Sequence, residues 1–290
     1  MPQKYSIDAA YQYCLDMAQR HYENFPVANG LLPRHLRRPV AAIYAFARSA
    51  DDLADEGCAD IESRLQQLDE YTIHLKAIEQ NRAPDLPIFI ALQDSIIKHR
   101  LPVELFHDLL FAFKQDVTTH RYATYEDVLL YCRHSANPVG RLLLHLYNAA
   151  SATNLQQSDA ICTALQLINF FQDLSQDYIE NNRIYIPQTD WQHFGVTEQH
   201  FREQRSDKAM RDMMQFEYQR TKALFVSGQP LGLSLKGRIG FNMRAIYLGG
   251  VCVLRGLQDN TENVFRRPRL GKLDGLSILW HALTKQLPAS

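Results

Sequence analysis

The sequence has little excess charge, few cysteines and no long apolar run, and each absence excludes a class of protein. Its 31 Lys and Arg residues nearly balance 32 Asp and Glu residues, so nothing draws it electrostatically to nucleic acid. The five cysteines are scattered and form no CxxC pair, which is typical of free thiols in a reducing cytosol. No stretch approaches the ~18 apolar residues of a membrane span, and the N-terminus lacks the apolar core of a signal peptide. We therefore expect a cytoplasmic protein that binds no nucleic acid.

Helical periodicity dominates the chain, and strand-like alternation is scarce. Repeats, low-complexity tracts and flexible linkers are missing, so we predict one all-α domain over residues 1–290. The sequence "TYED" at Thr124 predicts a capping box, and Pro138 is expected to kink or break the helix that contains it. Helices are predicted at 6–23, 39–56, 60–80, 87–99, 103–117, 125–149, 158–180, 207–227, 232–258 and 272–285.

Two predicted helices carry aspartates at a spacing of four residues. "YAFARSADDLADEG" has Asp51 and Asp55, and "ALQLINFFQDLSQDYIENNRIYIP" has Asp173 and Asp177, with Asn169 four residues before Asp173 in the same polar stripe. Residues four apart share a helix face, and carboxylates among apolar neighbours are costly unless they are paired. A cation removes that cost, and oxygen ligands without His or Cys suit Mg²⁺. Because Mg²⁺ usually binds a few carboxylates together with substrate phosphates, the predicted ligand carries a diphosphate.

Ordinary surface roles are the competing interpretation of these residues. A single pair of aspartates four apart is usually a solvated helix face, and Arg48 can form an ion pair with Asp51 and Asp52 within its own helix. The basic run "RRPRLGK", residues 266–272, is either a solvated tail or a contact to a diphosphate or an anionic bilayer. Phosphate loops of the GxxxxGK[ST] or GxGxxG type are absent, and no motif context supports a Ser–His–Asp triad.

Two Asp-rich helices in an all-α chain resemble the squalene/phytoene synthase family, the head-to-head trans-isoprenyl diphosphate synthases. The resemblance runs from "YQYCLDMAQRHYENF" to "RAIYLGGVCVLRGL", with "DDLAD" as the first Asp-rich motif and "NFFQDLSQDYIENNRIYIP" as the second. It implies a single-domain isoprenoid synthase bundle of helices with a central cavity. In that fold the two motifs face each other and hold Mg²⁺, with Mn²⁺ as the alternative ion.

The resemblance also implies roles for individual residues. It assigns the metal to Asp51, Asp55, Asn169, Asp173 and Asp177. It assigns catalytic roles to Arg48, Tyr131, Asn169 and Asp173, with Tyr131 near the cationic intermediates. It assigns contacts with substrate to His21, Phe25, Tyr44, Arg48, Asn137, Gln172, Arg183, Tyr185 and Tyr247.

Departures from the family pattern narrow the assignment. Glu23 stands where the family often has a basic residue, and Gln172 precedes Asp173 where the family commonly has Arg. The stretches "HYENFPVA", "RRPVAAIYAFARSADD" and "NPVGRLLL" are most similar to the bacterial hopanoid-pathway branch, the hydroxysqualene synthases of the HpnC type. Such an enzyme ionises presqualene diphosphate and lets water capture the rearranged cation, so no NADPH is expected. Tyr131 or polar groups of the "SANP" segment are candidates to hold that water.

Two alternatives stay open at this point. One is a squalene or phytoene synthase that joins two prenyl diphosphates, and the other is a non-catalytic assembly or binding protein of the same family. In each enzymatic case the product is nearly insoluble in water. We therefore expect peripheral contact with the inner face of the cell membrane, without insertion, and pathway enzymes as further partners.

Overall fold

The computed structural model describes residues 5–20, 32–55, 57, 59–82, 84–260, 262–268 and 271–287. In these ranges the regular structure is helical, and a single isolated parallel bridge joins Arg121 to Ile184. The prediction of an all-α protein is therefore confirmed. The chain divides into two compact units, residues 1–118 with 138–150, and residues 119–137 with 151–290. The single domain stays a prediction, because it concerns how these two units join.

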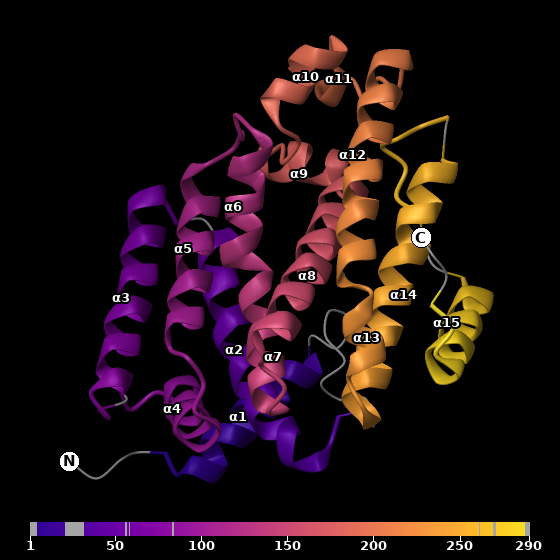
Figure 1. The fold of residues 1–290 in the computed structure, drawn as a ribbon. Coiled ribbons are helices and arrows are strands. Elements are labelled where there is room, and N and C mark those ends of the chain that lie inside the picture. Colours follow the sequence, from indigo (N-terminus) through magenta and orange to yellow (C-terminus); the bar gives the residue numbers. More distant parts are fainter. Residues whose placement is uncertain are drawn as a thin grey trace. The chain divides into compact units, whose positions relative to one another are not determined.

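The first unit is organised around α2, which packs against α1, α3, α4 and α5 (Figure 1). Phe46 of α2 is fully buried, and its ring meets Phe89 and Phe106 edge-on at centroid distances of 6.1 and 5.4 Å. Such perpendicular aromatic pairs favour a tightly packed core. The helices of this unit are α1 (Ile7–Arg20), α2 (Arg34–Asp55), α3 (Ile61–Glu79), α4 (Pro87–His99), α5 (Glu104–Thr118) and, from Pro138 on, α7 (Asn137–Leu146).

The second unit is organised around α8 and α12, which pack along each other and both contact α14. Gly228 permits the close approach of α12 to α8, since a Cβ there would lie 2.5 Å from Ile161 Cγ1. The helices of this unit are α6 (Tyr125–Ser135), α8 (Ala152–Gln172), α9 (Leu174–Asn181), α10 (Gln188–Phe194), α11 (Glu198–Arg202), α12 (Lys208–Gly228), α13 (Pro230–Ser234), α14 (Gly237–Asp259) and α15 (Lys272–Thr284).

Several predicted boundaries need correction. Helix α2 begins at Arg34, ahead of the predicted start at Pro39, because Leu36 is buried and extends the helix by more than a turn. The predicted helix 125–149 is broken at Ala136, which confirms the effect expected of Pro138. The predicted helix 158–180 begins earlier, after the cap residue Ser151, and is interrupted at Asp173. The predicted helix 232–258 is divided into α13 and α14 at Leu235 and Lys236, and the short helices α10 and α11 were not predicted.

The predicted capping box at the start of α6 is confirmed. The backbone N–H of Asp127 donates to Thr124 Oγ1 at 3.2 Å, and the backbone N–H of Thr124 donates to Asp127 Oδ2 at 2.9 Å. Two backbone donors that an isolated helix would leave exposed are thereby satisfied.

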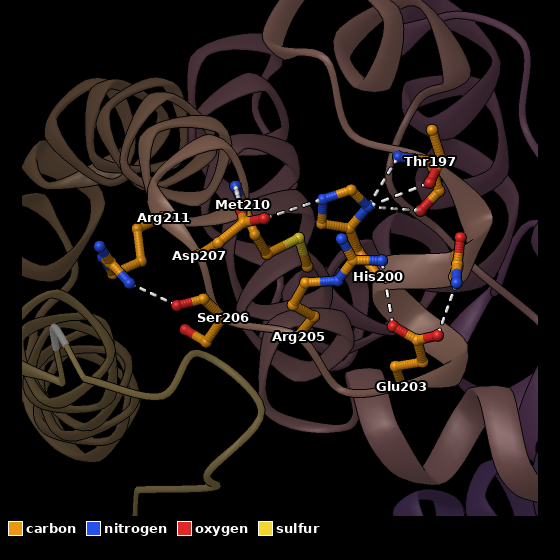
Figure 2. Close-up of polar contacts among 9 residues, drawn as sticks. Thr197, His200, Glu203, Arg205, Ser206, Asp207, Met210 and Arg211 are labelled. Atoms are coloured by element: carbon orange, nitrogen blue, oxygen red, sulfur yellow. Dashed lines mark hydrogen bonds and ion pairs between the residues drawn. The ribbon is translucent and has the colours of Figure 1, made fainter.

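His200 joins the ends of α11 and α12 (Figure 2). Its Nδ1 lies 3.1 Å from Thr197 Oγ1, and its Nε2 lies 3.2 Å from a carboxylate oxygen of Asp207, the cap residue of α12. The neighbouring Ser206 Oγ accepts a hydrogen bond from the backbone N–H of Val264 at 3.2 Å. This junction therefore ties down residues 262–268, a segment that returns below beside the second Asp-rich motif.

A partly buried arginine links three helices of the second unit. Arg220 of α12 forms ion pairs with Glu217 and with Asp190 of α10, and its guanidinium carbon lies 3.7 Å from the centroid of the Tyr125 ring on α6. Glu217 is only 1% exposed, and burial raises its pKa to about 8 although Arg220 opposes the shift. The guanidinium thus offsets the burial of two carboxylates.

We predict that Arg220→Ala lowers the free energy of unfolding by about 3–5 kcal/mol, because Glu217 and Asp190 would lose their cation inside the protein. Urea unfolding followed by circular dichroism measures the change. The control is Lys208→Ala on the same helix, which breaks an exposed pair with Asp212 and should cost less than about 1 kcal/mol. Equal losses in the two variants would contradict the prediction.

Candidate functional site

The first Asp-rich motif occupies the last turn of α2. Arg48 Nη1 lies 3.3 Å from Asp51 Oδ2, and Arg48 Nη2 lies 2.6 Å from Asp52 Oδ1. The intrahelical ion pair considered from the sequence is therefore present. Contact between Arg48 and a substrate stays a prediction.

Acids at the C-terminal end of a helix oppose the helix dipole, so this turn needs stabilisation from elsewhere. Arg64 of α3 supplies it, since its guanidinium donates to the carbonyl oxygens of Ala54, Gly57 and Ala59. Gly57 has a φ of +83°, a conformation that glycine adopts readily and that turns the chain out of the helix. The turn that carries Asp51 is thereby held by a cation of the neighbouring helix.

The carboxyl group of Asp51 lies among other acids. Burial, followed by the charge of Asp55, raises its pKa to about 7, against the opposing effect of Arg48, and Asp116 of α5 adds to the rise. Asp116 is 5% exposed. About 40% of the Asp51 side chain nevertheless remains accessible, so a cation can reach it. These properties fit a carboxylate that gains a divalent cation, as the resemblance implies for Asp51 and Asp55.

Within the residues that the structure describes, no three His, Cys, Asp or Glu side chains already converge as metal ligands do. Asp116 was not among the predicted site residues. Its one signal was an acid on the otherwise apolar face of "LLFAFKQDV", where Phe113 and Val117 pack into the core.

An apolar pocket of about 130 Å³ lies in the same unit, next to the first motif along α2. Tyr44, predicted to contact substrate, lines it one turn before Arg48. The other lining residues are Val40, Ile43 and Ala47 of α2 and Val139, Leu142 and Leu143 of α7. The pocket thus combines a hydrocarbon lining with a polar end of α2 nearby.

The second Asp-rich motif spans the break between α8 and α9. Asp173 has φ −104° and ψ 13°, which interrupts the helix. The N–H of Asp173 still donates to the carbonyl of Asn169 at 3.0 Å, and the N–H of Asp177 donates to the carbonyl of Asp173 at 2.8 Å. The spacing of the predicted polar stripe is therefore kept by backbone hydrogen bonds, although the helix is not continuous.

The segment 262–268 lies against this motif. Arg267 Nη1 is 3.1 Å from Asp173 Oδ1, and Gln172 Nε2 donates to the carbonyl of Pro268 at 3.2 Å. Burial raises the pKa of Asp173, and Arg267 opposes that rise. Part of the basic run 266–272 thus contacts the motif, while Arg269 and Leu270 lie outside the described residues. Substrate contact by Gln172 stays a prediction.

Arg183 and Tyr185 follow α9 and are both buried. Arg183 Nη1 donates to the Tyr185 hydroxyl at 3.1 Å, and the N–H of Arg183 donates to the carbonyl of Asp177 at 3.0 Å. The Tyr185 ring stacks on Phe170 of α8 with 3.7 Å between centroids. These contacts connect the second motif to an aromatic group.

That group, here called the aromatic cluster, consists of Tyr122, Tyr131, Phe170 and Tyr185. The centroids of Tyr131 and Tyr122 lie 5.3 and 5.4 Å from that of Tyr185. Tyr122 and Phe170 were not among the predicted site residues. No local pattern could reveal Tyr122, because the bridge between Arg121 and Ile184 brings together segments 63 residues apart.

Four predicted site residues remain, and the structure describes two of them. Asn137 is 7% exposed, and its amide oxygen accepts a hydrogen bond from Thr163 at 3.0 Å. Tyr247 of α14 is 1% exposed and meets Phe225 edge-on at 5.8 Å. His21 and Phe25 lie outside the described residues. Substrate contacts of all four stay predictions.

Comparisons with known proteins give the same family that the two Asp-rich motifs resemble. Residues 18–274 match the family model of squalene/phytoene synthases. A hydroxysqualene synthase of Rhodopseudomonas palustris is 36% identical over 251 residues, which cover 85% of this chain and 84% of that protein. A hydroxysqualene synthase of Zymomonas mobilis is 40% identical over 178 residues, 60% of this chain and 58% of that one. A phytoene synthase of Mycobacterium tuberculosis is 27% identical over 66% of this chain and 61% of its own.

Two solved structures are similar to the chain as well. The squalene synthase HpnC from Alicyclobacillus acidocaldarius superimposes with a TM-score of 0.83 at 36% identity, covering 89% of this chain and 96% of that one. A dehydrosqualene synthase in complex with ligand gives a TM-score of 0.84 at 20% identity, covering 96% of this chain and 97% of that one, which shows the fold alone.

We predict that Mg²⁺ binding releases protons and weakens as the pH falls. Without a cation the pKa of Asp51 is about 7, so a growing fraction of this carboxyl is protonated below that pH and must ionise before it can bind a metal. The apparent affinity should fall by up to about tenfold per pH unit below the pKa.

Isothermal titration calorimetry in two buffers of different ionisation enthalpy counts the released protons. Asp51→Asn should lower the release strongly, because this carboxyl carries the larger rise in pKa. Asp60→Asn, which alters an exposed cap residue whose pKa is lowered, should leave it unchanged. Proton release of the same size in Asp51→Asn would contradict the assignment.

Proposed function

The chain belongs to the squalene/phytoene synthase family and is an isoprenoid synthase, and we propose that it is a hydroxysqualene synthase acting on presqualene diphosphate. One observation carries this choice within the family. Identity to a hydroxysqualene synthase is 36% over 85% of the chain, whereas identity to a phytoene synthase is 27% over 66%. The proposed reaction breaks the bond between carbon and diphosphate, rearranges the cation, and adds the oxygen of water with loss of a proton.

The acids described above and Asn169 are the proposed metal ligands, and Asp51 and Asp173 fit that role because burial raises the pKa of each. Asp51 and Asp55 in the first unit, and Asn169, Asp173 and Asp177 in the second, would each hold Mg²⁺, or Mn²⁺ in its place. The ion, when bound, supplies the positive charge that stabilises a departing diphosphate. Cations of the chain itself add to this, since Arg48 and Arg267 already lie beside Asp51 and Asp173.

The hydrocarbon part of the substrate requires an apolar lining. The pocket at Tyr44 supports this, because it is walled by aliphatic side chains and lies one turn from Arg48. At about 130 Å³ the pocket can hold only part of an isoprenoid chain, and a part bound there would lie near the polar end of α2. The exclusion of water around most of the chain would protect the cation until capture.

The aromatic cluster supports stabilisation of the cationic intermediates. Aromatic faces attract cations, and the rings of Tyr131, Tyr185 and Phe170 lie within 6 Å of one another. Tyr131 also carries a hydroxyl that can orient the attacking water. Asn137 is the second candidate for that task, although its amide oxygen already accepts a bond from Thr163.

A squalene synthase is the second candidate function, because the structure at 36% identity is described as a squalene synthase. That activity would require a reductant, which our proposal does not. A phytoene synthase is less favoured by identity, and a non-catalytic family member is disfavoured by both Asp-rich motifs being intact.

Hydroxysqualene would supply a hopanoid pathway, so enzymes that consume it are the proposed partners. The chain would work in the cytoplasm, at the inner face of the membrane, where its product can leave into lipid. Among the described residues, no helix is long and apolar enough to cross a bilayer. The proposed contact is therefore peripheral.

We predict that purified protein with presqualene diphosphate and Mg²⁺ makes hydroxysqualene without NADPH. Because water captures the cation, the product should take up ¹⁸O from labelled solvent, as mass spectrometry would detect. Adding NADPH should change neither rate nor product. Formation of squalene from farnesyl diphosphate only when NADPH is present would instead favour the second candidate.

We predict that Asp173→Ala lowers turnover by at least about 100-fold, because it removes a carboxylate that holds the proposed ion. Steady-state kinetics at saturating Mg²⁺ measures the effect, and circular dichroism checks the fold. Asp212→Ala is the control, since this aspartate is exposed on α12 and lies in neither motif. Near-normal turnover in Asp173→Ala would remove the metal role of the second motif.

A further inference from the structure

Helix α15 (Lys272–Thr284) carries several large apolar side chains that are largely exposed in the described structure. Its exposed apolar residues are Leu273 at 81%, Leu276 at 65%, Leu279 at 46%, Trp280 at 63% and Leu283 at 66%. At 3.6 residues per turn they spread over about 120° of the helix circumference. Contiguous exposed apolar surface of this kind marks an interaction site. We call these five side chains the α15 stripe.

The helix is held firmly against its own unit by a different face. Ala282 is fully buried, and α15 packs beside α14 (Figure 1). Arg244 of α14 is 5% exposed, and its Nε donates to the carbonyl of Ala282 at 2.6 Å while its Nη1 donates to the carbonyl of Gly232 at 2.8 Å. A buried guanidinium thus anchors the last turn of α15. The α15 stripe is therefore presented by a fixed element.

The charge of the surrounding chain identifies the partner. Residues 236–287 contain nine Lys or Arg against three Asp or Glu, a net charge of +6, so the first 235 residues carry −7. Such asymmetry within one chain points to an anionic surface. Several of these cations are exposed, namely Lys236, Arg238, Arg255, Arg266 and Lys285. Leucine and tryptophan in one segment with exposed basic residues are the composition of helices that lie in a bilayer interface.

We propose that the α15 stripe docks the protein on anionic lipid bilayers, with Trp280 and the leucines entering the interface. A second copy of the chain is the other occupant to consider. Two such faces brought together would oppose like charges, whereas an anionic bilayer complements them. The inference deepens the peripheral contact of the proposed function and rests on it for its biological purpose. The binding itself is tested without any catalytic measurement.

Flotation with vesicles tests this directly. The full chain should float with phosphatidylcholine vesicles that contain phosphatidylglycerol, and much less with pure phosphatidylcholine or at high salt. Leu276→Ser combined with Trp280→Ser should lower the partition coefficient by at least about tenfold. The matched control is Ile73→Ser on α3, which removes an equally exposed apolar residue (62%) and should change partitioning less than about twofold.

Trp280 also reports on its own environment, since the chain has only two tryptophans and the other, Trp191, is 7% exposed. In a Trp191→Phe background, its emission should shift to the blue on addition of anionic vesicles and be quenched by brominated lipid. The proposal is wrong if the parent protein never floats, or if Ile73→Ser loses as much vesicle binding as the double variant Leu276→Ser/Trp280→Ser.

Sedimentation velocity tests whether a second copy of the chain occupies the stripe. The parent protein could instead form a dimer that the double variant Leu276→Ser/Trp280→Ser dissociates, with no binding to vesicles. That result would assign the stripe to self-association and overturn the proposal. Turnover assayed in detergent separates the docking proposal from the proposed enzymatic function. Vesicle binding without hydroxysqualene formation would overturn the proposed function alone, and hydroxysqualene formation without vesicle binding would overturn the docking alone.

Discussion

Partly buried carboxylates, each paired with a cation of the chain, are the constraint on which the candidate site depends. Burial raises the pKa of both Asp51 and Asp173, and a guanidinium opposes the rise in each case, Arg48 for the first and Arg267 for the second. The compensation is partial at Asp51, where Asp55 and Asp116 add further negative charge. A divalent cation would complete it, because its charge is larger than that of one guanidinium. The same arginines would then be available to a diphosphate.

The backbone around these acids is shaped to present them. Asp51 lies in the last turn of α2, where Arg64 of α3 binds the carbonyls that follow. Asp173 lies at a break between α8 and α9, yet the backbone hydrogen bonds to Asn169 and from Asp177 continue across it. Both motifs therefore sit where a helix ends or is interrupted. Irregular backbone of this kind is sustained by specific contacts, which here are the arginine contacts themselves.

The sequence predicts features that depend on neighbouring residues, and it misses features that depend on contacts between residues far apart in the chain. Helical periodicity, the Thr124 capping box and the break at Pro138 are local, and the structure confirms all three. The burial of Leu36, which moves the start of α2, depends on tertiary packing, so a local reading placed that boundary at Pro39. Short helices such as α11 depend on contacts like that of His200 with Asp207, which no periodicity encodes.

The site shows the same division between local and long-range signals. The spacing of the aspartates was readable because it lies within one helical turn, and the family resemblance added roles to them. Arg267 belonged to a recognised basic run, but its pairing with Asp173 spans 94 residues and could not be read from either segment alone. Tyr122 and Tyr185 meet only because a bridge joins Arg121 to Ile184. Such pairs belong to the fold and not to any motif.

The segment 262–268, which carries Arg267, contacts the second Asp-rich motif and precedes the helix of the α15 stripe in the chain. It therefore relates the two parts of the second unit to which we assign functions. Residues 262–268 are tied to the start of α12 through Val264 and Ser206, and they end with Arg267 on Asp173 and Pro268 on Gln172. Helix α15 begins four residues after Pro268. The α15 stripe and the segment that contacts the second motif are therefore close along the chain, and an arginine holds both the stripe and the motif within the second unit. Arg244 binds the last turn of α15, and Arg267 binds Asp173. Both surfaces to which we assign functions are thus fixed by guanidinium contacts made far from them in the sequence.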